Sequence, residues 1–446
     1  MSLLIRNGLI VTMNDRFDVF TGDVSIRDGR IAAIGPDLDR EVGIPHDRVI
    51  DAHGDFVLPG LIQTHVHLCQ TLFRGHADDR PLMDWLRQRV WPMEAAHTPA
   101  TLRAATRLAT TELLSTGTTS VLTMETVHDT DAVFEAVAES GLRATIGKCM
   151  MDASSGVPRR LQEPMRASID ESLALRKTWH GAANGRLRAA FAPRFAVSCS
   201  RELLEAVAAL SEGQQALVHT HASESRDELL IVRERSGGLD NLEYLASLGL
   251  ANARLCVAHC VWADEREQAI LARHDVKVMH CPGSNLKLGS GIAPVHEMRA
   301  KGITVSLGAD GAACNNRLDM FEEMRLAALL QAIRATPGIL TARDALWMAT
   351  RAGARTLGLD DEIGSLEVGK RADVIVVSRD RVHLAPGPDP YSTLVYAARG
   401  SDVRATVVDG ERLVDDGVPV RVDPLEVVAT ARVAAADVAA RAANLV

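Results

Sequence analysis

The stretch PGLIQTHVHL, residues 59–68, places two histidines at the end of a short apolar run. Along a β-strand, residues i and i+2 point to the same side, so His65 and His67 would face the same way at the end of a strand over 61–67. Barrels of alternating strands and helices gather their functional side chains at the carboxyl ends of the strands. The stretch therefore predicts the first strand of such a barrel, with a candidate pair of metal ligands at its end.

Further candidate ligands close later apolar runs. ALVHTHASE contains His219 and His221, LCVAHC and VKVMHC contain His259 and His280, and ITVSLGAD ends in Asp310. Histidines scattered by chance would not select the same end of consecutive strands. Imidazole nitrogens and a carboxylate suit Zn²⁺, Fe²⁺ or a similar divalent ion, with one position left open for water. The pattern predicts a metal centre.

The rest of the chain supplies the other strands of this barrel. From about residue 61 to 360, short apolar runs alternate with amphipathic stretches, in roughly eight strand-then-helix units. Both chain ends instead contain short alternating runs punctuated by glycine. We expect an α/β fold in which a (β/α)8 TIM-like barrel is inserted into a small β-sandwich built from both chain ends. The expected boundaries are 1–57 and 363–446 for the β-sandwich and 58–362 for the barrel, with a terminal helix from Pro424.

Composition narrows the possible partners and location. The chain has 446 residues, 47% of them hydrophobic, and a net charge of −9, which argues against nucleic-acid binding. It contains no run of about 18 uncharged apolar residues and no secretory signal, so we expect no membrane partner. The seven cysteines are scattered, as is typical of reduced thiols. A cytoplasmic protein with a small-molecule partner is expected.

The segments PGLIQTHVHL, HASE, AHC and GADGAACNN resemble the amidohydrolase superfamily, and within it the aminohydrolase branch. This branch includes S-adenosylhomocysteine and methylthioadenosine deaminases, guanine deaminases and s-triazine hydrolases. The resemblance extends over essentially the whole chain. It implies a metal-dependent hydrolase that removes an amino group from an N-heteroaromatic ring and releases ammonia. Proteins of this kind are often oligomers, so a homo-oligomer is expected.

The resemblance also implies roles for individual residues. One divalent ion, Zn²⁺ with Fe²⁺ or Mn²⁺ as alternatives, would be held by His65, His67, His221 and Asp310. Glu224 would shuttle a proton to the ring, His259 would hydrogen-bond at the attacked carbon, and Asp310 would accept a proton from water. His219 matches no ligand and is expected to pack or to support one. No strand run ends in a lysine that could bridge two metals, so a single ion is expected.

The substrate is less well defined. TLFRGHADDRPLMDWLRQRVWPMEAAHT, residues 71–98, resembles the adenosine-type deaminases, which implies that Glu94 contacts ribose hydroxyls and that Trp85 packs over the pocket mouth. Arg160 would reach the far end of the substrate. For all three, an ordinary structural role stays open. Gln70 and Arg194 depart from that pattern and resemble the corresponding residues of guanine deaminases. An arginine in the pocket suits a substrate that has an oxo group or an anionic ring.

We therefore expect an adenosine-type nucleoside as substrate, such as S-adenosylhomocysteine, methylthioadenosine or 5′-deoxyadenosine. Deamination of guanine, 8-oxoguanine, a pterin or another oxo-heterocycle is an alternative, as is s-triazine hydrolysis. A non-catalytic scaffold of the same fold would lack the histidine and aspartate set that this chain contains. Hydrolysis of an amide or lactam ring would usually need a second metal and a bridging lysine.

Overall fold

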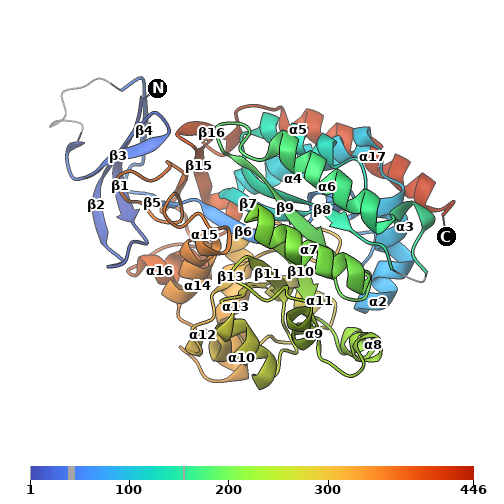
Figure 1. Ribbon diagram of the computed structural model, residues 1–446. Coiled ribbons are helices and arrows are strands. Elements are labelled where there is room, and N and C mark those ends of the chain that lie inside the picture. Colours follow the sequence, from blue (N-terminus) through green and yellow to red (C-terminus); the bar gives the residue numbers. More distant parts are fainter. Residues whose placement is uncertain (1, 39–45, 154–155, 446) are drawn as a thin grey trace.

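The structure is a computed structural model that describes residues 2–38, 46–153 and 156–445. At its centre, eight parallel strands pair in sequence order, and helices cover their outer side (Figure 1). This arrangement confirms the predicted barrel. Its strands are β6 (Leu61–Val66), β7 (Thr118–Met124), β8 (Arg143–Met150), β9 (Leu187–Pro193), β10 (Val218–Ala222), β11 (Leu255–His259), β12 (Lys277–His280) and β13 (Val305–Leu307).

The barrel closes where its last strand meets its first. The hydroxyl of Thr64 donates to the carbonyl of Leu307 at 2.9 Å, and the amide of Asp310 donates to the carbonyl of His65 at 3.0 Å. A Cβ atom at Gly308 would lie only 2.6 Å from the carbonyl oxygen of His65. A glycine is therefore required for this close approach.

Helices follow most of the barrel strands, and several of them start at side-chain caps. The hydroxyl of Ser225, for example, accepts from the amide of Glu228 in a capping box just after the HASE segment. The helices are α2 (Leu82–Trp85), α3 (Trp91–Ala95), α4 (Pro99–Ser115), α5 (Thr130–Ser140), α6 (Met165–Trp179), α7 (Arg201–Gln214), α8 (Arg226–Ser236), α9 (Asn241–Ser247), α10 (Glu265–Arg273), α11 (Pro282–Lys287), α12 (Val295–Ala300), α13 (Met320–Arg334), α14 (Ala342–Ala349), α15 (Arg351–Thr356), α16 (Pro390–Ser392) and α17 (Pro424–Ala442).

Strands from both chain ends form a second sheet beside the barrel (Figure 1). Its two halves join where β5 pairs antiparallel with β14, and hydrogen bonds connect all nine strands into one continuous sheet. Apolar side chains from both halves pack together as a separate core. The strands are β1 (Ser2–Val11), β2 (Val19–Arg27), β3 (Arg30–Gly35), β4 (Arg48–Asp51), β5 (Phe56–Pro59), β14 (Val374–Val377), β15 (Val403–Val408), β16 (Glu411–Asp415) and β17 (Val418–Pro419).

Within the described ranges, no helix combines the length and the apolar character that crossing a membrane would require.

A buried ion pair connects the barrel to the second sheet. Arg143, at the start of β8, donates from Nε and Nη2 to the two carboxylate oxygens of Asp373 at 2.7 and 2.9 Å. Both side chains are at most 5% exposed. Breaking such a pair leaves a charge buried without its partner, which is far more costly than losing an exposed pair.

We predict that Arg143→Ala lowers the free energy of unfolding by about 3–5 kcal/mol, because it strands the carboxylate of Asp373 in the interior. Urea denaturation followed by circular dichroism measures this loss. The matched control is Arg166→Ala, since Arg166 pairs with Asp170 on the exposed face of α6. Its expected effect is within about 0.5 kcal/mol. Equal effects of the two substitutions would contradict the structural importance of the buried pair.

Candidate metal centre and active-site pocket

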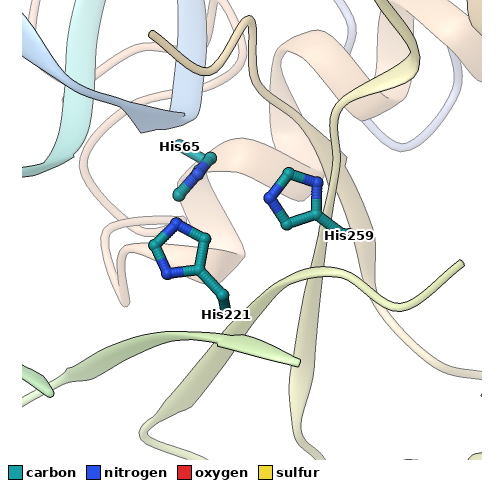
Figure 2. Close-up of side chains that lie close together, drawn as sticks. All are labelled: His65, His221 and His259. Atoms are coloured by element: carbon teal, nitrogen blue, oxygen red, sulfur yellow. The ribbon is translucent and has the colours of Figure 1, made fainter. Parts of the chain in front are cut away.

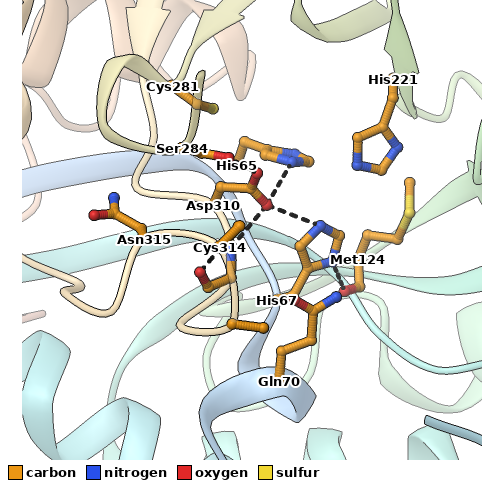
Figure 3. Close-up of polar contacts among 12 residues, drawn as sticks. His65, His67, Gln70, Met124, His221, Cys281, Ser284, Asp310, Cys314 and Asn315 are labelled. Carbon is orange, nitrogen blue, oxygen red and sulfur yellow. Dashed lines mark hydrogen bonds and ion pairs between the residues drawn. The ribbon is translucent and has the colours of Figure 1, made fainter. Parts of the chain in front are cut away.

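The predicted ligands meet at the carboxyl end of the barrel. His65 and His67, at the end of β6, direct their Nε2 atoms to the same oxygen of Asp310, at 3.3 and 3.2 Å (Figure 3). His221, from β10, and His259, from β11, turn their rings toward His65 (Figure 2). Potential ligand atoms lie within 4.8 Å of one another in two overlapping groups, one of His65, His67 and Asp310 and one of His65, His221 and His259.

Hydrogen bonds on the far sides of the rings fix which nitrogen faces the centre. Nδ1 of His67 lies 2.7 Å from the carbonyl of Met124, and Nδ1 of His221 lies 2.6 Å from the carbonyl of Arg194. A carbonyl only accepts, so each Nδ1 carries the proton and donates it. In the neutral rings the Nε2 lone pairs then point into the centre, as metal-binding histidines require.

The electrostatics of this centre fit a cation. Burial lowers the pKa of His65 to about 4 and the pKa of His221 well below its usual value, so both rings stay neutral. Burial alone would raise the pKa of Asp310, but the neighbouring imidazoles hold it well below its usual value. Nε2 of His65 is buried and has no hydrogen-bond partner among the described residues. Lone pairs and a carboxylate that converge in this way match the donor set of a divalent metal ion.

Asp310 is itself held by neighbours. Its Oδ1 accepts from the amide of Gly311 and its Oδ2 accepts from the hydroxyl of Ser284, both at 2.7 Å. Asp310 has a φ of 64°, and His259 has a φ of 73°. Both residues therefore adopt the left-handed backbone conformation, which a residue with a Cβ atom rarely does. These conformations occur at the ends of β13 and β11, where both side chains turn toward the centre.

Glu224 and His259 lie next to each other beside the centre. Nε2 of His259 lies 3.6 Å from Oε2 of Glu224 and 3.8 Å from Oδ2 of Asp310. The other ring nitrogen of His259 is 2.8 Å from the side-chain oxygen of Asn285, which orients the ring. Burial raises the pKa of Glu224 to about 7, so this carboxyl can bind or release a proton near neutral pH.

The centre opens into a pocket, and most of the site residues predicted from the sequence line it. Apolar side chains of α2 and its surroundings form one wall, and polar side chains form the floor. The lining residues are His67, Gln70, Leu82, Trp85, Leu86, Arg194, Phe195, His221, Glu224, His259, Leu288 and Asp310. Trp85, Gln70 and Arg194 therefore lie where the sequence predicted substrate contacts.

Glu94 lies behind this floor and joins two of its residues. Arg194 donates to both carboxylate oxygens of Glu94, at 2.5 and 3.2 Å, and Gln70 donates to one of them at 3.0 Å. All three side chains are buried. The side-chain oxygen of Gln70 keeps no partner among the described residues, and a Cβ atom at Gly311 would lie 2.1 Å from it. Gly311 thus leaves the space that Gln70 occupies.

Arg160 is a predicted substrate contact that, like Glu94, is not among the residues lining this pocket. It lies in the 3-10 helix η3 (Arg159–Leu161), where its side chain is 46% exposed and pairs with Asp129 at 3.3 Å. Residues 154–155 of the same loop lie outside the described ranges.

Three residues support the centre, and two of them, Ser284 and Glu125, had no assigned role in the sequence analysis. Ser284 holds Asp310, as described above. His219 hydrogen-bonds to Nδ1 of His65 at 2.7 Å, in agreement with the supporting role expected for it. Glu125 accepts from the amides of Leu68 and Cys69, at 3.2 and 3.0 Å, and so fixes the chain just after His67. Of Ser284 and Glu125, only Ser284 had a sequence signal, since it follows His280 in a polar loop after a strand.

Comparison with known proteins agrees with this geometry. The chain is 40% identical to a 5′-deoxyadenosine deaminase of Methanosarcina acetivorans over 99% of both chains. It is 41% identical to a 5-methylthioadenosine/S-adenosylhomocysteine deaminase of Desulforudis audaxviator, over 92% of this chain and 93% of the other.

Solved structures share the fold over nearly the full length. A zinc-bound adenosine deaminase from Xanthomonas campestris has a TM-score of 0.92 and 32% identity over 98% of both chains. A zinc complex of an atrazine chlorohydrolase from Arthrobacter aurescens TC1 has a TM-score of 0.90 and 29% identity over 97% of this chain and 100% of the other. Guanine deaminase from E. coli has a TM-score of 0.84 and 27% identity over 93% of this chain and 99% of the other. The amidohydrolase family model matches residues 56–413, and the chain belongs to the amidohydrolase family.

Proposed function

We propose that the protein is a mononuclear metal-dependent aminohydrolase that removes the ring amino group of an adenosine-type nucleoside and releases ammonia. The candidate substrates are 5′-deoxyadenosine, methylthioadenosine and S-adenosylhomocysteine, which the names of the relatives at about 40% identity include. The observation that carries the proposal is the pair of Glu224 and His259, set against Asp310 at the floor of a pocket. Loss of an amine requires proton donors and acceptors in this arrangement.

One divalent ion would be held by His65, His67, His221 and Asp310, with Zn²⁺ favoured by the zinc in two of the similar structures. Such an ion lowers the pKa of a water molecule from about 15.7 toward 7. Fe²⁺ and Mn²⁺ remain alternatives, because the same donor types bind them.

The side chains around the centre would carry the protons. Oδ2 of Asp310 faces His259 and can accept a proton released by water. Glu224 has a pKa of about 7, so it can give a proton to the ring nitrogen of the substrate and take one back within a turnover. His259, oriented by Asn285, stabilises the charge that develops as water adds to the ring carbon.

The charge of the pocket floor favours an adenosine-type ring over an oxo-purine. Because Glu94 compensates Arg194, the guanidinium does not offer a free positive charge to an anionic ring. A neutral adenine edge needs no such charge. In this arrangement Glu94 would act on the substrate through Arg194 and Gln70, while direct contact with ribose stays a prediction.

Deamination of guanine or a related oxo-heterocycle is the second candidate. Its support is that Gln70 and Arg194 both line the pocket, as their resemblance to guanine deaminases predicts. The uncommitted oxygen of Gln70 could accept from a ring N–H or amino group.

We predict that the purified protein binds about one divalent ion per chain. Asp310→Ala and His67→Ala should each lose most of this ion, since each removes a donor atom from the converging set. Ser284→Ala is the matched control and should keep it, because Ser284 donates to the carboxylate of Asp310 and is not one of the four proposed ligands. Elemental analysis after removal of excess metal gives the stoichiometry. Two ions per chain, or none in a folded protein supplied with zinc, would contradict the single-ion centre.

We predict that Glu224→Gln keeps the bound metal but lowers kcat for ammonia release by about 10²–10⁴-fold, because the amide cannot transfer a proton. An enzyme-coupled ammonia assay and elemental analysis measure the two quantities on the same sample. Glu234→Gln, the same change at an exposed position of α8, should leave both unchanged. Normal turnover by Glu224→Gln would disprove the proton-transfer role.

We predict that kcat/KM is at least about tenfold higher for an adenosine-type nucleoside than for guanine, a difference equivalent to one lost charged hydrogen bond. The triple variant Gln70→Met, Glu94→Gln, Arg194→His tests whether these three residues determine the preference for one ring over the other. Because Glu94 becomes a neutral glutamine, no buried carboxylate is left without a partner. The variant's ratio of kcat/KM between the two substrates should change by about tenfold. An unchanged ratio would show that these residues do not determine the ring preference, and a wild-type preference for guanine would favour the second candidate.

A further inference from the structure

A second cavity, of about 260 Å³, lies at the end of the barrel opposite the metal centre. Its wall is built from the amino ends of β8 and β9, the turns that precede β10 and β11, and the carboxyl ends of α6 and α15. In a parallel barrel, the amino ends of the strands lie on the face away from the active site. The cavity is therefore separate from the substrate pocket.

Four arginines line this cavity, and no aspartate or glutamate does: Arg176, Arg188, Arg254 and Arg355. Among the described residues, none of these four guanidinium groups forms an ion pair with a carboxylate. Two carboxylates interact electrostatically with these arginines without pairing with them: Glu362 with Arg188, and Asp15 with Arg355. Glu362 is already paired with Arg30 and Arg371, and Asp15 with Arg351. A concentrated positive charge thus remains in a chain whose net charge is −9.

The positive groups are held in place by neutral acceptors. Arg176 donates to the carbonyls of Ala189 and Gln214, both at 2.9 Å, and Arg188 donates to the carbonyl of Leu357 at 3.3 Å. Burial, and then the charge of Arg188, lowers the pKa of Arg176. Holding like charges together is unfavourable, and a bound anion would relieve this repulsion.

A different cavity in the same protein contains arginines that are all paired with carboxylates. Arg103, Arg107 and Arg421 line a cavity beside α4 and α5. There each arginine pairs with a glutamate, namely Glu139, Glu426 and Glu411. The described residues around the four-arginine cavity supply no such carboxylate partners, so the two cavities differ in the charge that they leave uncompensated.

We propose that the four-arginine cavity binds a small anion that carries phosphate groups. The planar guanidinium donates two parallel hydrogen bonds to a phosphate or carboxylate, and several such groups around one cavity suit a ligand with more than one negative charge. The site would act independently of the deamination reaction, since it shares no residue with the substrate pocket.

Isothermal titration of the metal-loaded protein with inorganic pyrophosphate tests the proposal, with uridine diphosphate as a second probe. We expect saturable binding of one ligand per chain that weakens as the NaCl concentration rises. Arg254→Gln should raise the Kd about tenfold, because it removes one charged donor, whereas Arg254→Lys should recover part of the affinity. Tighter binding of uridine diphosphate than of pyrophosphate would identify a nucleotide, and equal binding would identify a free phosphate ligand.

The matched control is Arg103→Gln, in the cavity whose arginines are paired, and it should leave the Kd unchanged. Arg188→Gln gives a second test from a different strand, and thermal denaturation checks that each variant is folded. The proposal fails if neither probe binds at millimolar concentration, or if Arg254→Gln and Arg188→Gln bind as tightly as the wild type. The second result would place the anion elsewhere, at the metal centre for example.

Discussion

The seam between β6 and β13 is the constraint on which the site depends. The hydrogen bond from the amide of Asp310 to the carbonyl of His65 closes the barrel and sets the two residues side by side. Their side chains then share one small space with the ring of His221, which arrives from β10. Small side chains are needed at this seam, as Gly308 shows, because any Cβ atom there would contact the backbone of His65. The contacts that close the barrel therefore also set the geometry of the candidate ligands.

The barrel and the clustering of histidines and Asp310 at its end could be predicted because both follow from local patterns. Strand ends are recognisable in sequence, and a (β/α)8 barrel brings all of them to one face. The short alternating runs at the two chain ends likewise predicted a joint β unit. It was expected as a small β-sandwich, and its nine strands form one continuous sheet. Contacts that depend on side-chain direction could not be derived. Arg160 pairs with Asp129, and Glu94 turns to Arg194, a residue one hundred positions away in the chain.

The Glu94–Arg194 pair shows how a buried charge can define a binding site. Desolvation makes such a pair a poor source of stability, which agrees with the proposal that it serves specificity in the pocket floor. The carbonyl of Arg194 also accepts from His221, so the same residue orients a proposed metal ligand and shapes the floor. A change of charge at this position would affect the pocket and the centre together. This dual contact constrains how the substrate preference of such a site can change.

Backbone strain at the site points to the same coupling. His259 and Asp310 adopt left-handed conformations that cost of order 1 kcal/mol or more for a residue with a Cβ atom. Glycine would relieve this cost at either position, but it would also remove the side chain that faces the centre. The surrounding fold must therefore supply the stability that these two positions lose. Buried hydrogen bonds supply part of this support: Asn285 holds the side chain of His259, and Ser284 holds the side chain of Asp310.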